Sequence, residues 1–129
     1  MDRELILTVH VQCLEALTIK GHTKDIVMIP FSGTAESPYF SGRVAGTGTD
    51  TQRISGGVCL LSARYILEGE DMTGAHCRIF IENESRPDGT LVPAIVTDSE
   101  ALAEWETASL RSEIEPVPEG VTVRIFRDI

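Results

Sequence analysis

The sequence predicts an all-β protein, an antiparallel β-barrel of about eight or nine strands with one short helix near the C-terminal third. Segments in which apolar and polar residues alternate recur roughly every ten residues, and turns rich in Gly, Pro, Asn and Asp separate them. Several of these segments are apolar on both faces, as in residues 58–67. That pattern favours a barrel, because a strand packed on one side only needs one apolar face.

Composition predicts a single domain over residues 1–129. The chain has 129 residues, of which 42% are hydrophobic and 24% are charged, and these values are typical of a globular protein. Its 20 acidic and 11 basic residues give a net charge of −9. Nucleic acid is therefore not an expected partner, because binding to a phosphate backbone needs clustered Lys and Arg.

Three cysteines are present, at positions 13, 59 and 77, with no C-x-x-C pair. This odd number predicts free thiols in a reducing compartment, and we expect the protein to be cytoplasmic. The first residues lack the basic and apolar regions of a secretory signal. No apolar run approaches the ~20 residues of a membrane-spanning helix, so we expect no membrane partner.

The N-terminal part of the chain predicts strands separated by short turns. The expected strands are residues 5–13, 14–19, 26–29 and 39–45, where 14–19 is either a separate strand or a continuation of the first. In the first strand Ile6 is the one apolar residue on the polar face. Pro30 directs the strand before it toward a sheet edge or a bulge, and residues 32–38 are typical of a loop.

The C-terminal part predicts further strands and the helix. The expected strands are residues 74–82, 91–96, 108–115 and 121–127. Thr97 and Glu100 have the spacing of a capping box, in which the two residues satisfy free backbone N–H groups at a helix start. We therefore expect a helix over residues 98–106, which contains the single tryptophan, Trp105.

The central stretch, residues 46–67, combines two Gly-rich turns with concentrated polar chemistry. Residues 58–67 are expected to pair with the strand before them as a β-hairpin. A two-residue turn places Asp50 on the same face as Tyr65, whereas a three-residue turn places it beside Arg64. The sequence leaves both registers open.

The hairpin also carries the candidate site. In the first register, Asp50, Gln52 and Tyr65 share an otherwise apolar wall, and a few polar groups on an apolar surface are typical of a site for a small organic molecule. Arg43 is a further candidate contact, and Arg64 joins the site in the second register. An Asp in apolar surroundings can have a raised pKa and act as a general base, so Asp50 is the candidate catalytic residue.

A structural interpretation of Asp50 stays open beside these functional ones. In it, the carboxylate caps the Gly-rich turn and pairs with one of the arginines at positions 43, 53 and 64. No cofactor and no metal are expected. The three histidines, at positions 10, 22 and 76, have no metal-ligand spacing, and the Gly-rich turn lacks the lysine of a phosphate-binding loop.

The same stretch resembles a bacterial and fungal family known as domain of unknown function 3237. The motifs that carry the resemblance are Gly48-Thr49-Asp50-Thr51-Gln52 and Ala63-Arg64-Tyr65, and the likeness covers mainly residues 26–83. Thr51 stands where many members have tryptophan, and the C-terminal region is shorter. The resemblance implies a compact antiparallel barrel without an assigned activity.

Three functions remain open at this point. The first is binding of a small, partly apolar organic ligand in or at the mouth of the barrel. The second is an isomerase, cyclase or lyase in which Asp50 is the general base and Tyr65 or Arg64 stabilises an oxyanion. The third is a homo-oligomeric interaction module, such as a homodimer formed through exposed strand edges.

Overall fold

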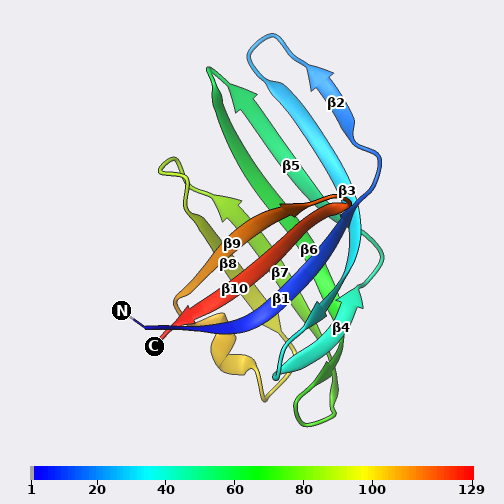
Figure 1. The fold of residues 1–129 in the computed structure, drawn as a ribbon, viewed down its shortest axis with the longest axis vertical. Coiled ribbons are helices and arrows are strands. Elements are labelled where there is room, and N and C mark those ends of the chain that lie inside the picture. The colour runs from blue at the N-terminus through cyan, green and yellow to red at the C-terminus, as the bar shows by residue number, and fades with distance from the viewer. Residues whose placement is uncertain (1) are drawn as a thin grey trace.

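In the computed structural model, which describes residues 2–129, ten strands form one antiparallel sheet that curls into a barrel (Figure 1). The order of the main strands is β8-β7-β6-β4-β3-β1-β10-β9, while β2 pairs with β3, and β5 pairs with β3 and β6. The strands are β1 (Arg3–Cys13), β2 (Leu17–Lys20), β3 (Asp25–Glu36), β4 (Phe40–Val44), β5 (Gly48–Ser55), β6 (Val58–Asp71), β7 (His76–Ser85), β8 (Leu91–Thr97), β9 (Leu110–Val117) and β10 (Gly120–Asp128). The predicted all-β antiparallel barrel is confirmed.

A β-bulge explains the misplaced apolar residue of the first strand. The pairing of β1 with β10 shifts between Leu5 and Leu7, so that Ile6 is an extra residue in its strand. Ile6 and Leu7 can therefore both point into the barrel, and both are fully buried. The alternation of the sequence resumes after the bulge with Val9, which is also buried.

The strand β3 is longer than expected and includes most of the predicted loop. Its second half pairs with β1, with Gly33 opposite Val11 and Ala35 opposite Val9. The loop prediction for 32–38 was wrong because the inward residues in this part are small, so the alternation is hard to see. On one side of β3, the first half pairs with β2 and the second half pairs with β1, and Pro30 lies between these two paired segments. Its missing N–H therefore costs no ladder bond.

The end of the barrel that the short helix closes is filled by the hydrophobic core. Large buried side chains fill it, among them Ile6, Leu7, Phe40, Leu67, Ile79, Ile81, Leu102 and Ile125. The helix is η1 (Ala103–Glu106), a single 3₁₀ turn that buries Trp105 against Tyr39, with ring centroids 5.9 Å apart. No helix of the described residues is long and apolar enough to cross a membrane.

The predicted helix over 98–106 was wrong in its length. The residues expected to begin it are held by β7 instead, because Thr97 Oγ1 donates to the Arg78 carbonyl at 2.8 Å and the Arg78 N–H donates to Asp98 Oδ1 at 2.8 Å. The Thr97 N–H donates to Glu106 at 3.1 Å, and Glu100 does not complete the expected capping box. Tertiary hydrogen bonds thus outweigh the local helix signal.

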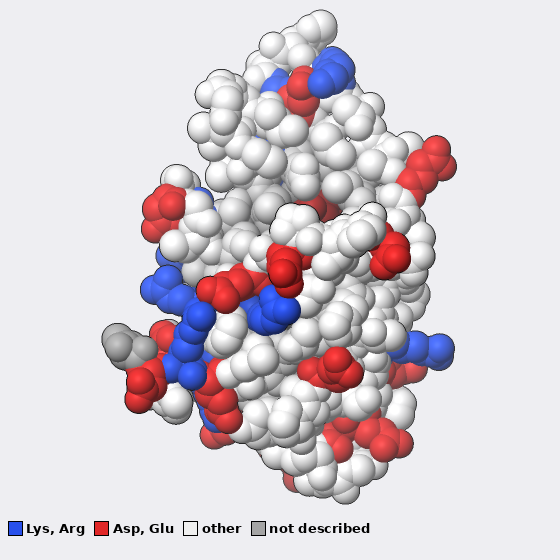
Figure 2. All heavy atoms as spheres, viewed as in Figure 1, with Lys and Arg blue, Asp and Glu red and all other residues white. Residues whose placement is uncertain are grey.

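Two features of the barrel wall position the site. The first is an extension of the sheet, formed by β2, β5, the first half of β3 and the start of β6, which we call the wing. The wing rises above the ends of β1, β9 and β10 (Figure 1). Figure 2 shows that most charged side chains of the visible face lie below the wing, which carries a small group of acidic and basic side chains near its tip.

The second feature is a seam between β8 and β9. These strands end the sheet order and pack against each other, but within residues 2–129 they share no hydrogen-bonded ladder. Inside the barrel, Ser112 Oγ of β9 donates to Asn83 Oδ1 of β7 at 3.0 Å. Pro93 lies in β8, where the edge of a sheet tolerates a residue without an N–H.

Candidate functional site

The turn between β5 and β6 sets the register that the sequence left open. Gly56 and Gly57 both have positive φ, 58° and 79°, and they form a two-residue turn between the paired residues Ser55 and Val58. Positive φ at both central positions is typical of a type I′ hairpin turn, and glycine adopts it without steric cost. Asp50 is therefore opposite Ala63 and shares its sheet face with Tyr65.

A cavity of about 200 Å³ lies at the foot of the wing, and we call it the mouth cavity. Asp50 and Gln52 of β5 line it together with Leu61, Ala63 and Tyr65 of β6. The other walls come from strands far away in sequence, and their apolar residues include Val11, Ile29, Ile114, Val121 and Val123. The hairpin thus supplies Asp50, Gln52 and Tyr65, while the terminal strands close the cavity.

Two aromatic rings of the core also line the mouth cavity. Phe31 and Tyr65 meet edge to face with their centroids 5.4 Å apart, and both are buried. Gly48 allows this arrangement, because a Cβ at that position would lie 2.4 Å from Cζ of Phe31 and 2.8 Å from Cβ of Tyr65. The glycine of the Gly-rich turn is thus needed for packing next to the site.

Two polar atoms of the site are buried without a hydrogen-bond partner among the described residues, namely Asp50 Oδ1 and Tyr65 Oη. The other carboxylate oxygen, Asp50 Oδ2, accepts a hydrogen bond from Gln52 Nε2 at 3.0 Å. Buried polar groups in native proteins are nearly always paired, so an unpaired one needs an explanation. Two residues that line the mouth cavity thus each carry one buried polar atom without a partner, an acceptor on Asp50 and a hydroxyl group on Tyr65.

Burial changes the proton affinity of both groups in the same direction. It raises the pKa of Asp50 above its usual value of 3.8, and the hydrogen bond from Gln52 opposes this by stabilising the ionised form. Burial also raises the pKa of Tyr65, so its hydroxyl stays neutral. The cavity thus combines a carboxylate with a phenol that can donate or accept a hydrogen bond.

The candidate arginines do not reach the mouth cavity. Arg64 lies opposite Thr49 on the other face of the sheet, where its Nε is 2.6 Å from Glu82 Oε2, because the two-residue turn directs it outward. Arg43 of β4 lines a surface groove beside Arg78 instead. The expectation that Arg64 joins Asp50 belonged to the three-residue turn, which the structure does not have. Asp50 forms no ion pair within the described residues.

Asn83 is a lining residue that lies just outside the strand expected over residues 74–82. It lies in β7, is 3% exposed, and its side-chain oxygen is held by Ser112. A signal for it exists, because Asn83 continues the inward positions of Cys77, Ile79 and Ile81 as a polar residue in an apolar series. Cys13, which is exposed, also lines the cavity.

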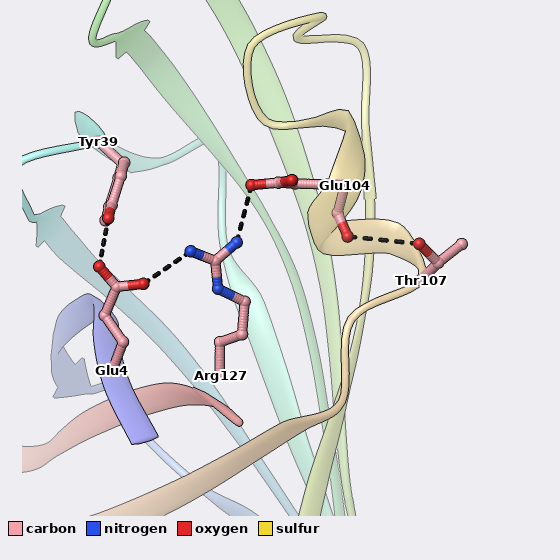
Figure 3. Close-up of polar contacts among 5 residues, drawn as sticks. All are labelled: Glu4, Tyr39, Glu104, Thr107 and Arg127. Carbon is pink, nitrogen blue, oxygen red and sulfur yellow. Dashed lines mark hydrogen bonds and ion pairs between the residues drawn. The ribbon is translucent and has the colours of Figure 1, made fainter. Parts of the chain in front are cut away.

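A second polar cluster, at the other end of the barrel, is structural in character (Figure 3). The Tyr39 hydroxyl donates to Glu4, and the Arg127 guanidinium donates to Glu4 and to Glu104 at 2.7 Å each. The bond from Tyr39 lowers the pKa of Glu4. These side chains join β1, β10 and η1 and satisfy one another, apart from Arg127 Nε.

No metal-binding group is found in residues 2–129, where no three His, Cys, Asp or Glu side chains come together as ligands. His10 Nε2 lies 3.0 Å from Glu36 Oε1, within hydrogen-bond distance, on exposed side chains of the barrel. The cysteine pattern also leaves three free thiols, of which only Cys77 is buried.

The family of the chain follows from a match over most of its length. A family described as "Protein of unknown function (DUF3237)" matches residues 2–113. The chain belongs to the DUF3237 family. This confirms the resemblance seen at the hairpin and extends it from the first strand, β1, to the start of β9. None of the proteins with curated functions matches the chain.

Solved structures share the fold of this DUF3237 chain. A protein of unknown function from Clostridium acetobutylicum has a TM-score of 0.83 at 21% identity, with 98% of this chain and 96% of that chain covered. An enzyme from Penicillium herquei has a TM-score of 0.77 at 15% identity, covering 98% and 92%. A β-barrel-like protein from Acinetobacter baumannii has a TM-score of 0.69 at 15% identity, covering 98% and 96%. At these identities the likeness concerns the fold.

Proposed function

We propose that this DUF3237 protein binds a small, partly apolar organic molecule in the mouth cavity. The observation that carries the proposal is a pair of buried, unpartnered polar atoms, Asp50 Oδ1 and Tyr65 Oη, on two residues that line one cavity with apolar walls. Sites for small molecules typically combine apolar walls with a few fixed polar groups. Gln52, which holds the Asp50 carboxylate, would orient the polar end of the site.

The energetics of the free atoms support this function. A buried polar group without a partner costs about 1–3 kcal/mol, and a ligand that pairs with it recovers that free energy on binding. The volume of about 200 Å³ compares with the ~150 Å³ of an apolar cavity that accepts benzene. The proposed ligand therefore has the size of one ring with a few substituents.

Native mass spectrometry of the freshly purified protein, repeated under denaturing conditions, tests the proposal. We expect a bound mass in the native protein that is lost on denaturation. Ala63→Phe would fill the cavity and should remove the bound mass, whereas Thr51→Ala, on the outer face of β5, should keep it. A bound mass that persists in the Ala63→Phe protein would place the ligand elsewhere.

A second candidate is an isomerase, cyclase or lyase in which Asp50 is the general base. The raised pKa of Asp50 favours it, because a base with higher proton affinity abstracts a proton more readily. The neutral Tyr65 hydroxyl could donate to an oxyanion, whereas Arg64 faces outward. The rate of such an enzyme should rise with pH through the titration of Asp50, and a flat profile in the acidic range would contradict this function.

A homodimer formed through the wing is the third candidate. The outer face of the wing carries exposed large apolar side chains, namely Leu17, Ile19, Met28, Val58 and Leu60. The short strand β2 also has a free edge, since it pairs only with β3. Light scattering after size exclusion tests this candidate, and Ile19→Glu should convert a dimer into a monomer. A wild-type protein that runs as a monomer would rule it out.

We also propose that the protein is cytoplasmic, on the basis of its three free thiols. Thiol labelling of the protein in fractionated cells tests this. Labelling of all three cysteines in the cytoplasmic fraction after denaturation is the expected result, and a disulfide-linked form would contradict it.

A further inference from the structure

We infer that the ligand of the mouth cavity carries a protonated amine on a small apolar body, and that Asp50 binds this ammonium group. The inference rests on the proposed function and specifies the class of ligand that the same site takes. Three features of the site carry it, namely the charge of the lining, the direction of the nearby arginines and the chemistry of the two free atoms.

Among the described residues, the lining of the mouth cavity holds one carboxylate and no basic side chain. Asp50 is the only charged residue among the residues that line it, and the others are apolar or neutral polar. An ionised carboxylate in apolar surroundings is costly unless an opposite charge pairs with it. A ligand cation supplies that charge, a neutral hydroxyl supplies a hydrogen bond only, and an anionic ligand would be repelled.

The fold keeps the nearest cations of the hairpin away from Asp50. The pairing of β5 with β6 directs Arg53 and Arg64 to the outer face, and Glu82 binds Arg64 there. The contact of Asp50 within its own strand is the amide of Gln52, which holds one carboxylate oxygen and leaves Oδ1 free. Asp50 lines the cavity, and within the described residues no ion pair compensates its negative charge.

The two unpartnered atoms, Asp50 Oδ1 and Tyr65 Oη, can both accept hydrogen bonds from an ammonium group. An ammonium group has three N–H donors and no acceptor, while Asp50 Oδ1 and the oxygen of the Tyr65 hydroxyl can both accept a hydrogen bond. A hydrogen bond from a charged donor to a carboxylate is roughly twice as strong as a neutral one. The rings of Phe31 and Tyr65 add a surface that attracts cations and packs against an apolar body.

Calorimetric titration of the full chain with three probes of one shape tests the inference. The probes are benzylamine, benzyl alcohol and benzoate, which carry a cation, a neutral hydroxyl group and an anion on the same ring. At pH 7 we expect benzylamine to bind at least about tenfold more tightly than benzyl alcohol, and benzoate not to bind. The affinity for benzylamine should fall as the pH is lowered through the titration of Asp50, whose pKa lies above 3.8.

Variants identify Asp50 as the source of the preference. Asp50→Asn keeps the shape of the side chain and removes its charge, so benzylamine and benzyl alcohol should then bind about equally. Asp50→Glu keeps the charge and should retain a preference for the amine. Thr51→Ala, on the outer face, should behave as the wild type, and thermal melting of each variant checks that it is folded.

The outcomes separate this inference from the proposed function. If benzyl alcohol binds as tightly as benzylamine to the wild type, or if Asp50→Asn keeps the preference, the ammonium inference is refuted while the binding function stands. If no probe binds and the freshly purified protein also carries no bound mass, both are refuted.

Discussion

Replacing Tyr65 by phenylalanine should stabilise the ligand-free protein, although most substitutions of buried residues destabilise. The Tyr65 side chain is 5% exposed, and its hydroxyl has no partner among the described residues. Tyr65→Phe removes this hydroxyl and keeps the ring that packs on Phe31. A buried polar group without a hydrogen bond costs about 1–3 kcal/mol, so the free energy of unfolding should rise by about that amount.

The chain offers a matched control, because its other tyrosine is in the opposite situation. The Tyr39 hydroxyl donates to the Glu4 carboxylate (Figure 3), and its ring packs on Trp105. Tyr39→Phe removes a hydrogen bond that is made, so it should lower the stability. The same chemical change at two sites thus has opposite expected signs.

Urea unfolding at pH 7, on protein freed of any ligand by refolding, measures both effects. The midpoint should move up for Tyr65→Phe and down for Tyr39→Phe with an unchanged slope, since neither variant alters the surface exposed on unfolding. In thermal melting each 1 kcal/mol corresponds to roughly 4 °C for a domain of this size. A Tyr65→Phe protein less stable than the wild type would mean that the hydroxyl is already paired, and this would refute the argument for a ligand at that atom.

Three further outcomes are expected. Trp105→Ala should lower the free energy of unfolding by about 3–5 kcal/mol in urea denaturation, because it empties a fully packed site under the barrel; a loss below ~1 kcal/mol would contradict this packing. Hydrogen bonds, chiefly from Thr73, lower the pKa of Asp71 from 3.8 to about 2. The ionised form of Asp71 therefore stabilises the fold above pH ~4, and this stabilisation is lost as the pH falls toward 2. At neutral pH the Asp71→Asn protein should have a lower free energy of unfolding than the wild type. This difference should shrink as the pH is lowered, which an acid titration followed by circular dichroism measures. A deficit that does not change with pH would refute this origin. Gly48→Ala should lower stability by about 1–3 kcal/mol in the same urea assay, because the added methyl group would lie 2.4 Å from the buried Phe31 ring, and an unchanged midpoint would show that the ring can move.

The fold class could be predicted because alternation and turn residues are local properties of the chain. The bulge at Ile6 and the small inward residues of β3 hid part of the alternation, so one residue and one loop were misplaced. The helix over 98–106 was predicted too long because its capping residues bind β7, which lies outside the local sequence. Local patterns thus predict the elements and miss what distant strands do to them.

The candidate site shows the same division. Asp50, Gln52 and Tyr65 could be grouped from the hairpin alone, given a two-residue turn, and the φ angles of Gly56 and Gly57 select that turn. Asn83 was missed although it continues the inward alternation of β7, whereas the walls from β1, β9 and β10 could not be found, because the pairing of strands far apart in sequence places them there.

The seam between β8 and β9 gives the barrel a weak line beside its cavity. Two strands that meet only through side chains can separate without breaking a main-chain hydrogen bond between them. The Asn83–Ser112 hydrogen bond connects the two sides of the seam inside the barrel, and Asn83 also lines the mouth cavity. We therefore expect opening of the barrel along the seam to cost less free energy than opening along a paired strand, because no ladder of main-chain hydrogen bonds has to break.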